Sequence, residues 1–379
     1  MAADTHDITR DQFMLTGQLA QRGYDWWWHS FTAHHARTGE AKAFFIEFFL
    51  INPAIGGPEP IFGQAPASKR EGLRPSYLMV KAGCWGHDAR QLHRFFGWDE
   101  VEVGRGTPYY VLADDCIACE TDLVGHVVVS PEDAAAHPEW MCDAGSMWWD
   151  LKLDKQIAWN VGLGASQPVR ESGAFEMFWH AEGMKTQVSG RVWLDGEEYV
   201  VTPETSFGYA DKNWGADFTS PWVWLASSNL TSRVTGRKLE HSAFDIGGGR
   251  PKIGPVALEG KLLGEFVHEG TPYEFNFSKP WTGSSTVFDC HETDDQLVWH
   301  VEQRTLTALL VTDVTCPKSE MLLVNYESPD GEHLHRRLWN GGTGTGRVQL
   351  FRQRGVAVEL VDDMDCANVG CEFGEYARA

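Results

Sequence analysis

Thr186-Gln-Val-Ser-Gly-Arg-Val-Trp-Leu194, Asp195-Gly196 and Glu197-Glu-Tyr-Val-Val201 follow one another without a break in the chain. Apolar and polar residues alternate along both outer runs, and this period of two is typical of a strand with one buried face. An Asp-Gly pair supplies the positive φ angles that a two-residue hairpin turn requires. The stretch therefore predicts a β-hairpin and favours a β-rich fold.

Other strand patterns occur along the rest of the chain. The run Ala41-Lys-Ala-Phe-Phe-Ile-Glu-Phe-Phe-Leu-Ile51 is apolar and aromatic and ends at the breaker Asn52-Pro53. Shorter runs occupy residues 297–301, 320–326 and 348–350. Helical patterns are confined to residues 131–140 and a segment around residues 88–96. We therefore expect an all-β fold with few short helices.

Two glycine-rich stretches, Asp245-Ile-Gly-Gly-Gly-Arg-Pro251 and Asn340-Gly-Gly-Thr-Gly-Thr-Gly-Arg347, resemble phosphate-binding loops in composition. Such loops bind phosphate because they point backbone amides and the start of a helix at the anion. Neither stretch opens a predicted helix. We therefore expect β-turns at both places.

The length of 379 residues favours two domains. A weak internal repeat supports this division: an aromatic strand, a Thr-Gly turn and a strand that carries an acid occur at residues 26–47 and again at residues 222–245. The boundary is expected after the hairpin, which gives domains of residues 1–203 and 204–379.

The composition narrows the range of partners. The chain contains 17 Trp and 20 Phe, which predicts thick aromatic cores, an aromatic-lined cavity, or both. A net charge of −21 repels nucleic acid and anionic headgroups. No window has the ~18 consecutive apolar residues of a membrane span, and the sequence at Met1 lacks a signal-peptide pattern, so we expect a cytoplasmic protein.

The eight cysteines are expected to be reduced, buried thiols rather than metal ligands. Cys116-Ile-Ala-Cys119 is a lone CxxC pair, and Cys366 and Cys371 are too widely spaced for a zinc knuckle. We expect no metal and no cofactor, because the sequence also lacks nucleophile-elbow and zinc-helix motifs.

The densest cluster of polar and aromatic residues is Gly208-Tyr-Ala-Asp-Lys-Asn-Trp-Gly215, followed by Trp222-Val-Trp224. This pattern resembles the signature of the tocopherol-cyclase-like family, with Asp211 where Glu is commoner. The resemblance implies two lipocalin-like β-barrels or sandwiches in tandem. It also implies relatives, including carotenoid hydratase-like proteins and fungal Diels–Alder cyclases, that act on long isoprenoid or polyketide substrates.

Several acids and bases are candidates for the chemistry. Glu47 lies between apolar neighbours, and burial of that kind raises the pKa of a carboxyl group. Asp211 and Lys212 are expected in a loop, where one could donate a proton and the other could orient a substrate oxygen. His180 and Glu182 are two residues apart, so they share a strand face on which His180 could relay a proton. Structural roles, such as an ion pair for Glu47 or backbone capping in the loop, compete with each of these assignments.

The candidate ligand-binding residues are aromatic rings, histidines and polar side chains near the motif. Ring faces can stabilise a passing cation by about 0.5–2 kcal/mol each, although the same rings can simply form a core. His29 and His241 are each expected more often to have a structural role than a catalytic one. The set is Trp28, His29, Tyr209, Asn213, Trp214, Trp222, Trp224, His241 and Asp245.

These observations favour a cofactor-independent isomerase, cyclase, intramolecular lyase or hydratase. Its substrate is expected to be a large hydrophobic molecule, isoprenoid, quinol or polycyclic, held in an aromatic-lined cavity of some hundreds of Å³ and attacked by acid catalysis. Peripheral membrane contact during substrate uptake is also expected. A non-catalytic lipocalin-type carrier is the main alternative, and an interaction protein whose aromatic residues are all core is the third.

Overall fold

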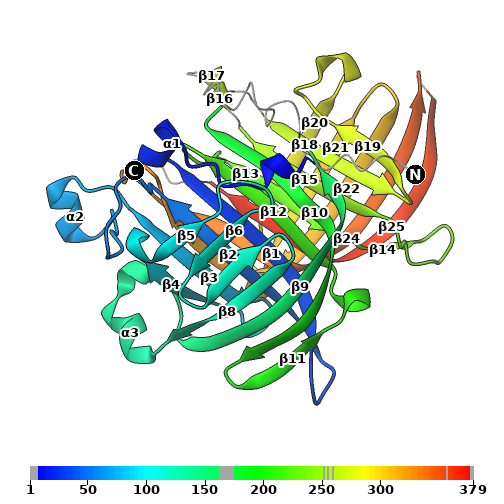
Figure 1. Ribbon diagram of the computed structural model, residues 1–379. Helices are drawn as coiled ribbons and strands as arrows, with labels where there is room; N and C mark the ends of the chain where they lie inside the picture. Colours follow the sequence, from blue (N-terminus) through cyan, green and yellow to red (C-terminus); the bar gives the residue numbers. More distant parts are fainter. Residues whose placement is uncertain are drawn as a thin grey trace.

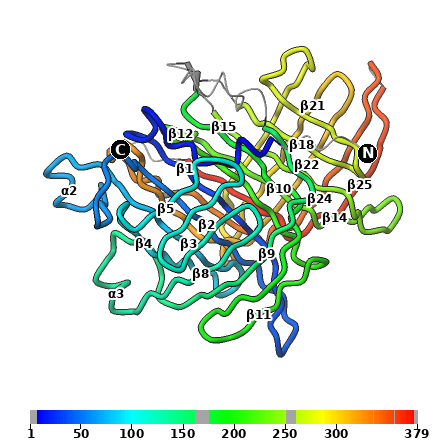
Figure 2. The backbone as a smooth tube through the Cα atoms, viewed as in Figure 1, coloured from blue at the N-terminus to red at the C-terminus, as the bar shows by residue number. Residues whose placement is uncertain are grey.

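The computed structural model describes residues 7–161, 175–250, 252–253, 256–257, 260–355 and 357–375. Two large, strongly curved antiparallel sheets lie side by side (Figure 1). Figure 2 follows the chain through the first sheet, in blue to green, and then through the second, in green to red. The expected all-β fold of two barrel-like units is confirmed.

The first sheet has twelve strands among the described residues, and β12 pairs with both β1 and β10. In sheet order the strands are β4 (Arg90–Phe96), β3 (Tyr77–Cys84), β2 (Ala41–Ile51), β1 (Tyr24–His35), β11 (Glu197–Val201), β10 (Met177–Leu194), β9 (Gly145–Trp159), β8 (Asp122–Val129), β7 (Cys116–Cys119), β6 (Tyr110–Ala113) and β5 (Val101–Val103), with β12 (Gly208–Gly215) beside them.

The second sheet has eleven strands in the described ranges, and a separate two-stranded ribbon joins β16 (Lys252–Ile253) to β17 (Val256–Ala257). The strands of the second sheet are, in order, β19 (Thr271–Phe275), β18 (Lys261–His268), β15 (Ala243–Gly249), β13 (Trp222–Ser227), β25 (Ala357–Gly374), β24 (Leu334–Arg354), β22 (Ala308–Pro317), β21 (Gln296–Arg304) and β20 (Ser285–Glu292), with β14 (Asn229–Ser232) on β25 and β23 (Leu322–Glu327) on β24.

Helices are few and short in the part of the chain that the structure describes. The α-helices are α1 (Gln18–Gln21), α2 (Pro66–Glu71) and α3 (Pro131–Ala136), and the 3₁₀ turns are η1 (Ile8–Arg10), η2 (Trp98–Glu100), η3 (Pro138–Trp140), η5 (Pro203–Thr205), η6 (Pro280–Thr282) and η7 (Lys318–Glu320). None of the helices in these ranges has the length and apolar character needed to cross a membrane.

One of the two helix predictions is confirmed and the other is wrong. The helix expected at residues 131–140 is α3 followed by η3, with Ser130 as its N-cap. The segment around residues 88–96 is instead the strand β4, which pairs with β3 from Leu78 to Cys84. Leu92 is fully buried in the first barrel, so pairing and packing outweigh the local helical pattern.

The predicted hairpin is confirmed as β10 and β11, with Leu194 opposite Glu197. Asp195 and Gly196 both have positive φ angles, 49° and 84°, as a two-residue hairpin turn requires.

The strands between the two barrels are buried on both faces, which explains the continuous apolar run at Ala41–Ile51. In β2, Phe44, Ile46 and Phe48 belong to the core of the first barrel. Phe45 and Phe49, on the opposite face, belong to a second cluster that also contains residues of the other sheet. A strand covered on both sides has no solvent face, so its sequence does not alternate.

The glycine-rich stretches are strands and not the β-turns that the sequence predicted. Residues 245–249 lie in β15 and residues 340–347 in β24. Large rings occupy the space that side chains would need: a Cβ on Gly247 would lie 2.9 Å from the Trp179 ring, and a Cβ on Gly342 would lie 2.2 Å from Trp85. The glycines therefore allow the indole rings to lie against the strand backbone.

The two copies of the internal repeat are comparable strand pairs. Thr-Gly turns with positive φ at Gly39 and Gly236 precede β2 and β15, which carry Glu47 and Asp245. Strand β12 belongs to the first sheet although it lies beyond residue 203. The division into domains of residues 1–203 and 204–379 stays a prediction.

Candidate functional site

The candidate site lies in the layer where the two sheets pack against each other. We call this the inter-sheet layer. It is a buried cluster to which the first sheet contributes residues such as Tyr24, Trp28, Phe45 and Trp179, and the second Trp222, Trp224 and Tyr326. Rings from both sheets contact one another, for example Trp26 and Tyr326 with centroids 5.5 Å apart. Four carboxyl groups lie among these rings, three of them buried and the fourth, that of Glu372, partly buried.

Asp211 is the first of these acids and projects from β12. Its Oδ2 accepts a hydrogen bond from Trp179 Nε1 at 2.9 Å, and the Tyr209 hydroxyl lies 3.3 Å away. Its Oδ1 makes no hydrogen bond of ordinary distance and angle with the described residues, although the nearby Trp26 indole also favours the charged form of the carboxyl group. Burial raises the pKa of Asp211 to about 8, although the bond from Trp179 opposes the shift. The carboxyl group is therefore protonated at neutral pH.

Asp245 faces Asp211 from the second sheet. The Tyr209 hydroxyl lies 2.9 Å from its Oδ2, and Trp224 Nε1 donates to its Oδ1 at 3.0 Å. Burial raises the pKa of Asp245 well above its usual range, and the neighbouring Asp211 adds to the shift. Two like charges in so small a space are unfavourable, so the pair holds at least one proton.

Glu372 is an acid of the site that the sequence analysis missed. It projects from β25 and accepts hydrogen bonds of 2.5 Å from Trp222 Nε1 and from Asn340 Nδ2. Burial raises the pKa of Glu372 to about 7. The sequence did contain a signal that Glu372 is a candidate: it is a single charged residue between Cys371 and Phe373, and a similar pattern identified Glu47.

Glu47 is fully buried, as expected, and it also has a basic partner. Lys81 Nζ lies 3.1 Å from its Oε2, to which the Tyr326 hydroxyl also donates at 3.0 Å. Burial raises the pKa of Glu47 and lowers the pKa of Lys81, so both shifts favour a neutral pair. Glu47 therefore has the basic partner that the structural alternative required, in a pair that burial shifts toward its neutral form. Lys81 and Tyr326 were not identified from the sequence.

One cavity borders two of these acids, and a second cavity shares the Trp222 side chain with it. The first is lined by Asp211 and Glu372 and by the rings of Trp26, Trp28, Trp222, Trp224 and Tyr326, and has a volume of about 10 Å³. The second is mostly apolar, has a volume of about 90 Å³ and is lined by Trp179 and Trp222 among others. Both are smaller than the several hundred Å³ that the sequence analysis expected for a bound ligand.

Lys212 lies away from this layer, and the expectation of a loop at this place is wrong. Residues 208–215 form a fully buried strand, so consecutive side chains point to opposite faces. Lys212 enters the first barrel, where it pairs with Asp25 and lies 3.5 Å from the centroid of the Trp27 ring. The glycines that suggested a loop permit close approach: a Cβ on Gly215 would lie 2.1 Å from a backbone oxygen of Glu176.

His29, His180 and Glu182 also face the interior of the first barrel. His180 Nε2 lies 3.0 Å from Asp11 Oδ1, and Glu182 Oε2 lies 2.5 Å from Lys155 Nζ. Burial lowers the pKa of His29 to about 3, so its imidazole stays neutral. These residues form a separate buried polar group on the side of β10 and β12 opposite Asp211.

Asn213, Trp214 and His241, three further predicted ligand residues, lie in different parts of the structure. Asn213 is buried beside the layer and accepts a hydrogen bond of 2.7 Å from the Tyr24 hydroxyl. Trp214 stacks on Phe178 in a small cluster at one end of the first barrel and does not line either cavity. His241 lies on an exposed turn between strands.

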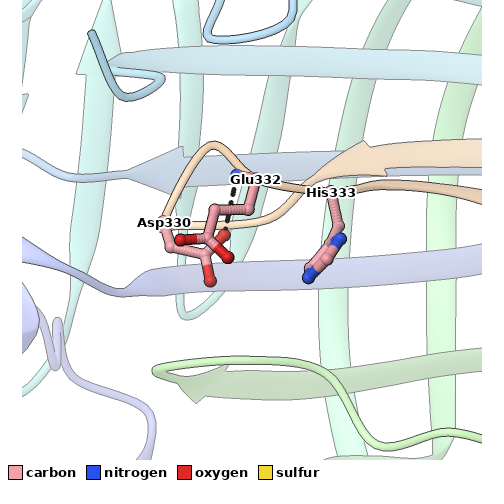
Figure 3. Close-up of side chains that lie close together, drawn as sticks. All are labelled: Asp330, Glu332 and His333. Carbon is pink, nitrogen blue, oxygen red and sulfur yellow. Dashed lines mark hydrogen bonds between the residues drawn. The ribbon is translucent and has the colours of Figure 1, made fainter. Parts of the chain in front are cut away.

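A metal site is not supported by the cysteines, all of which are free thiols, five of them buried. Asp330, Glu332 and His333 come close together in a turn (Figure 3). Asp330 Oδ1 accepts hydrogen bonds from Ser328 and from the Glu332 backbone, and Arg22 Nη2 lies 2.9 Å from its Oδ2. These contacts explain why the three side chains lie close together: they stabilise a surface turn.

No protein-family model matches the chain. A protein of Oryza sativa subsp. japonica named "Probable tocopherol cyclase, chloroplastic" is 35% identical over 114 residues. The chain is similar to a tocopherol cyclase. The matched segment covers 29% of this chain and only 22% of that protein. The resemblance that the motif indicated is therefore confirmed over part of the chain, and the activity of the tocopherol cyclase remains a property of that protein.

Solved structures with similarity to the chain include three proteins of low sequence identity. An AttH-like protein of Nitrosomonas europaea is 12% identical, with 100% of this chain and 99% of that chain covered and a TM-score of 0.42. Kievitone hydratase of Nectria haematococca is 11% identical, with 98% and 93% covered and a TM-score of 0.48. CghA with Sch210972 is 12% identical, with 94% and 89% covered and a TM-score of 0.45.

Proposed function

We propose that the inter-sheet layer is the active site of a cofactor-independent enzyme that acts on a large hydrophobic small molecule by acid catalysis. The substrate class is an isoprenoid, quinol or polycyclic compound, and the reaction is a cyclisation, hydration or double-bond shift. The observation that carries the proposal is the position of the Asp211 carboxyl group, which is buried and borders an aromatic-walled cavity. Burial raises its pKa to about 8, in the range that a proton donor needs at neutral pH.

Asp211 is the proton donor in this proposal. Its proton passes to one carbon of an alkene, the π electrons form the new C–H bond, and a cation develops on the other carbon. The faces of Trp28, Trp222 and Trp224 stabilise that cation, by about 0.5–2 kcal/mol for each well-placed ring. A hydroxyl group of the substrate or a water molecule then adds to the cation and returns a proton to the Asp211 carboxylate, which completes the cycle without an oxidant or cofactor.

Binding of such a substrate requires the cavities to open, because drug-sized ligands occupy roughly 300–1,000 Å³. Trp222 lines both cavities. A rotation of its indole would join the apolar cavity to the polar one. The apolar part of the substrate then lies against Trp179 and Leu263, and the reacting carbon lies beside Asp211.

The carrier alternative predicts ligand binding without a role for the acid. We would incubate the protein with a total lipid extract and identify retained and altered lipids by mass spectrometry. Asp211→Asn removes the proton donor at nearly constant volume, so we expect product formation to fall by about 10²–10⁴-fold while lipids are still retained.

Glu47→Gln is the matched comparison, because it alters the other expected acid of the layer. If Glu47→Gln loses turnover while Asp211→Asn keeps it, Glu47 is the acid. If both variants retain lipids and turn them over like the wild type, acid catalysis by these residues is wrong. If the wild type retains lipids and alters none of them, carriage replaces the enzyme proposal.

A further inference from the structure

Glu372 and Asp211 line the same small cavity from opposite sheets. Glu372 projects from β25 of the second sheet, and Asp211 projects from β12 of the first. The two carboxyl groups are close enough for the charge of Glu372 to contribute to the raised pKa of Asp211. A molecule that enters this cavity would therefore meet one carboxyl group from each sheet.

Both oxygens of Glu372 accept hydrogen bonds from groups that can only donate. Trp222 Nε1 donates to Oε2 and Asn340 Nδ2 donates to Oε1, each at 2.5 Å. The orientation of the Asn340 amide is set by Trp85, whose Nε1 donates to Asn340 Oδ1 at 2.8 Å. Neither an indole N–H nor an amide NH₂ can accept a proton, so these partners favour the carboxylate form of Glu372.

Asp211 has hydrogen bonds of a different kind. The bonds from Trp179 and from the Tyr209 hydroxyl both go to Oδ2. Oδ1 makes no bond of ordinary geometry with the described residues, so this oxygen is able to carry a proton. Burial raises the pKa of Asp211 to about 8 and the pKa of Glu372 to about 7, in the order that the hydrogen bonds indicate. Acids whose environments separate their pKa values in this way are suited to the roles of acid and base.

We propose, on the basis of the proposed function, that Glu372 is the general base of the reaction and accepts the proton of a hydroxyl group that adds to the substrate cation. Asp211 first gives its proton to one alkene carbon. The hydroxyl oxygen, from the substrate or from water, then bonds to the other carbon, its O–H bond breaks, and Glu372 Oε2 takes the proton. After the product leaves, the proton passes through water from Glu372 to the Asp211 carboxylate, which restores both groups.

The opening of the cavity frees the oxygen that this role requires. Trp222 lines both cavities and also donates to Glu372 Oε2. If its indole rotates to admit a substrate, Oε2 loses that donor while Oε1 keeps the bond from Asn340. A carboxylate oxygen left without a donor in this layer is unfavourable, so a hydroxyl group is favoured in place of the indole N–H. The site therefore selects an alkene that has a hydroxyl group, or a water molecule, near the double bond.

The other titratable groups near Glu372 do not offer an alternative base in the cavity. The charge of Glu47 raises the pKa of Glu372 and the charge of Lys81 lowers it. Neither of these residues, nor Asp245, lines either cavity. Tyr326 does line the smaller cavity, but its hydroxyl donates to Glu47.

The first test is the pH dependence of turnover, with a total lipid extract as the probe and altered lipids measured by mass spectrometry. The base must be charged and the acid protonated, so the wild-type rate should rise through about pH 7 and fall through about pH 8. Glu372→Gln should lower the rate by about 10²–10⁴-fold and remove the rising limb. Glu359→Gln is the matched control and should behave like the wild type, because Glu359 is an exposed acid of the same strand.

The second test is the composition of the product that the wild type forms in deuterium oxide. The product should carry one carbon-bound deuterium, which comes from Asp211. Loss of one exchangeable hydrogen identifies a hydroxyl of the substrate as the nucleophile, and addition of one water identifies water. A product with neither change overturns the role of Glu372, because no hydroxyl group has then lost a proton.

The role of Glu372 is also overturned if the wild-type rate has no rising limb near pH 7, or if Glu372→Gln keeps the wild-type rate. The pH profile and the product composition are measured on the wild type, so they decide the matter even if Glu372→Gln does not fold. A failure of the proposed function gives a different result. In that case the wild type alters no lipid at all, and Glu372 has no reaction to serve.

Discussion

Asp211 and Lys212 are consecutive residues of β12 whose side chains lie on opposite sides of one sheet. Asp211 lies among the rings of the inter-sheet layer, where Trp179 donates a hydrogen bond to it. Lys212 lies inside the first barrel and pairs with Asp25. The two adjacent side chains therefore do not meet. One belongs to the candidate site and the other to the interior of a barrel.

Asp211 predicts a particular dependence of stability on pH. Its pKa is 3.8 without burial and about 8 in the folded protein, so the folded state holds a proton that the unfolded state has lost between these values. The free energy of unfolding should therefore fall as pH rises from about 4 to about 8. Urea titrations across this window should show a smaller slope for Asp211→Asn. If the free energy of unfolding of Asp211→Asn changes with pH as steeply as that of the wild type, the raised pKa of Asp211 is contradicted.

The rate of turnover should also depend on the protonation of Asp211, at pH values above its pKa. A proton donor with a pKa of about 8 is lost as the pH rises through that value, so turnover should fall above about pH 8. Rates measured with a substrate found by the lipid screen would show this limb. A rate that keeps rising through pH 8 would exclude Asp211 as the acid.

Lys212→Met should be strongly destabilising, because it leaves the Asp25 carboxylate buried without its cation. The expected loss is about 3–5 kcal/mol in urea denaturation, and the double change with Asp25→Asn should recover part of it. Lys152→Met is the control, since Lys152 is 69% exposed and pairs with Asp122 at the surface. That variant should lose no more than about 1 kcal/mol. Equal losses in the two variants would contradict the burial argument.

Trp214→Ala should reduce stability without opening the candidate site. The ring is 1% exposed and stacks on Phe178, so its removal should cost about 3–5 kcal/mol in the free energy of unfolding. Lipid retention by the folded variant should match the wild type, because Trp214 lines neither cavity. Loss of retention under conditions where the variant is folded would place Trp214 in the binding site after all.

Gly247→Ala tests the contact between β15 and the ring of Trp179. The added methyl group would lie 2.9 Å from that ring, so we expect a loss of about 1–3 kcal/mol. Gly106→Ala is the control, because a Cβ there would meet no atom within 4 Å and its backbone φ is not positive. A neutral Gly247→Ala would show that the two sheets can separate slightly at low cost.

Local patterns predicted much of the fold. The Asp-Gly turn fixed the register of β10 and β11, and the lone acid in an apolar run correctly indicated that Glu47 is buried. Both signals are contained in a few neighbouring residues. The expectation of a loop at residues 208–215 failed because its polar residues have partners far away in the sequence, such as Asp25 for Lys212.

The rest of the site depends on contacts between distant segments. Tyr326 and Glu47 are 279 residues apart, and nothing near either residue specifies the other. The glycines of β15 and β24 were misjudged for the same reason. Their need for space comes from Trp179 and Trp85 on the opposite sheet, so it is not visible in the stretches themselves.

The two faces of β12 allow changes in chemistry to be separated from changes in folding. Substitutions at Tyr209 and Asp211 alter the acids and hydrogen bonds of the inter-sheet layer, whereas substitutions at Lys212 alter the barrel interior. Under the proposed function, varying alternate positions of this single strand would change the proposed reaction while the barrel keeps its internal contacts. The same alternation gives an engineer a short list of positions at which to vary reactivity first.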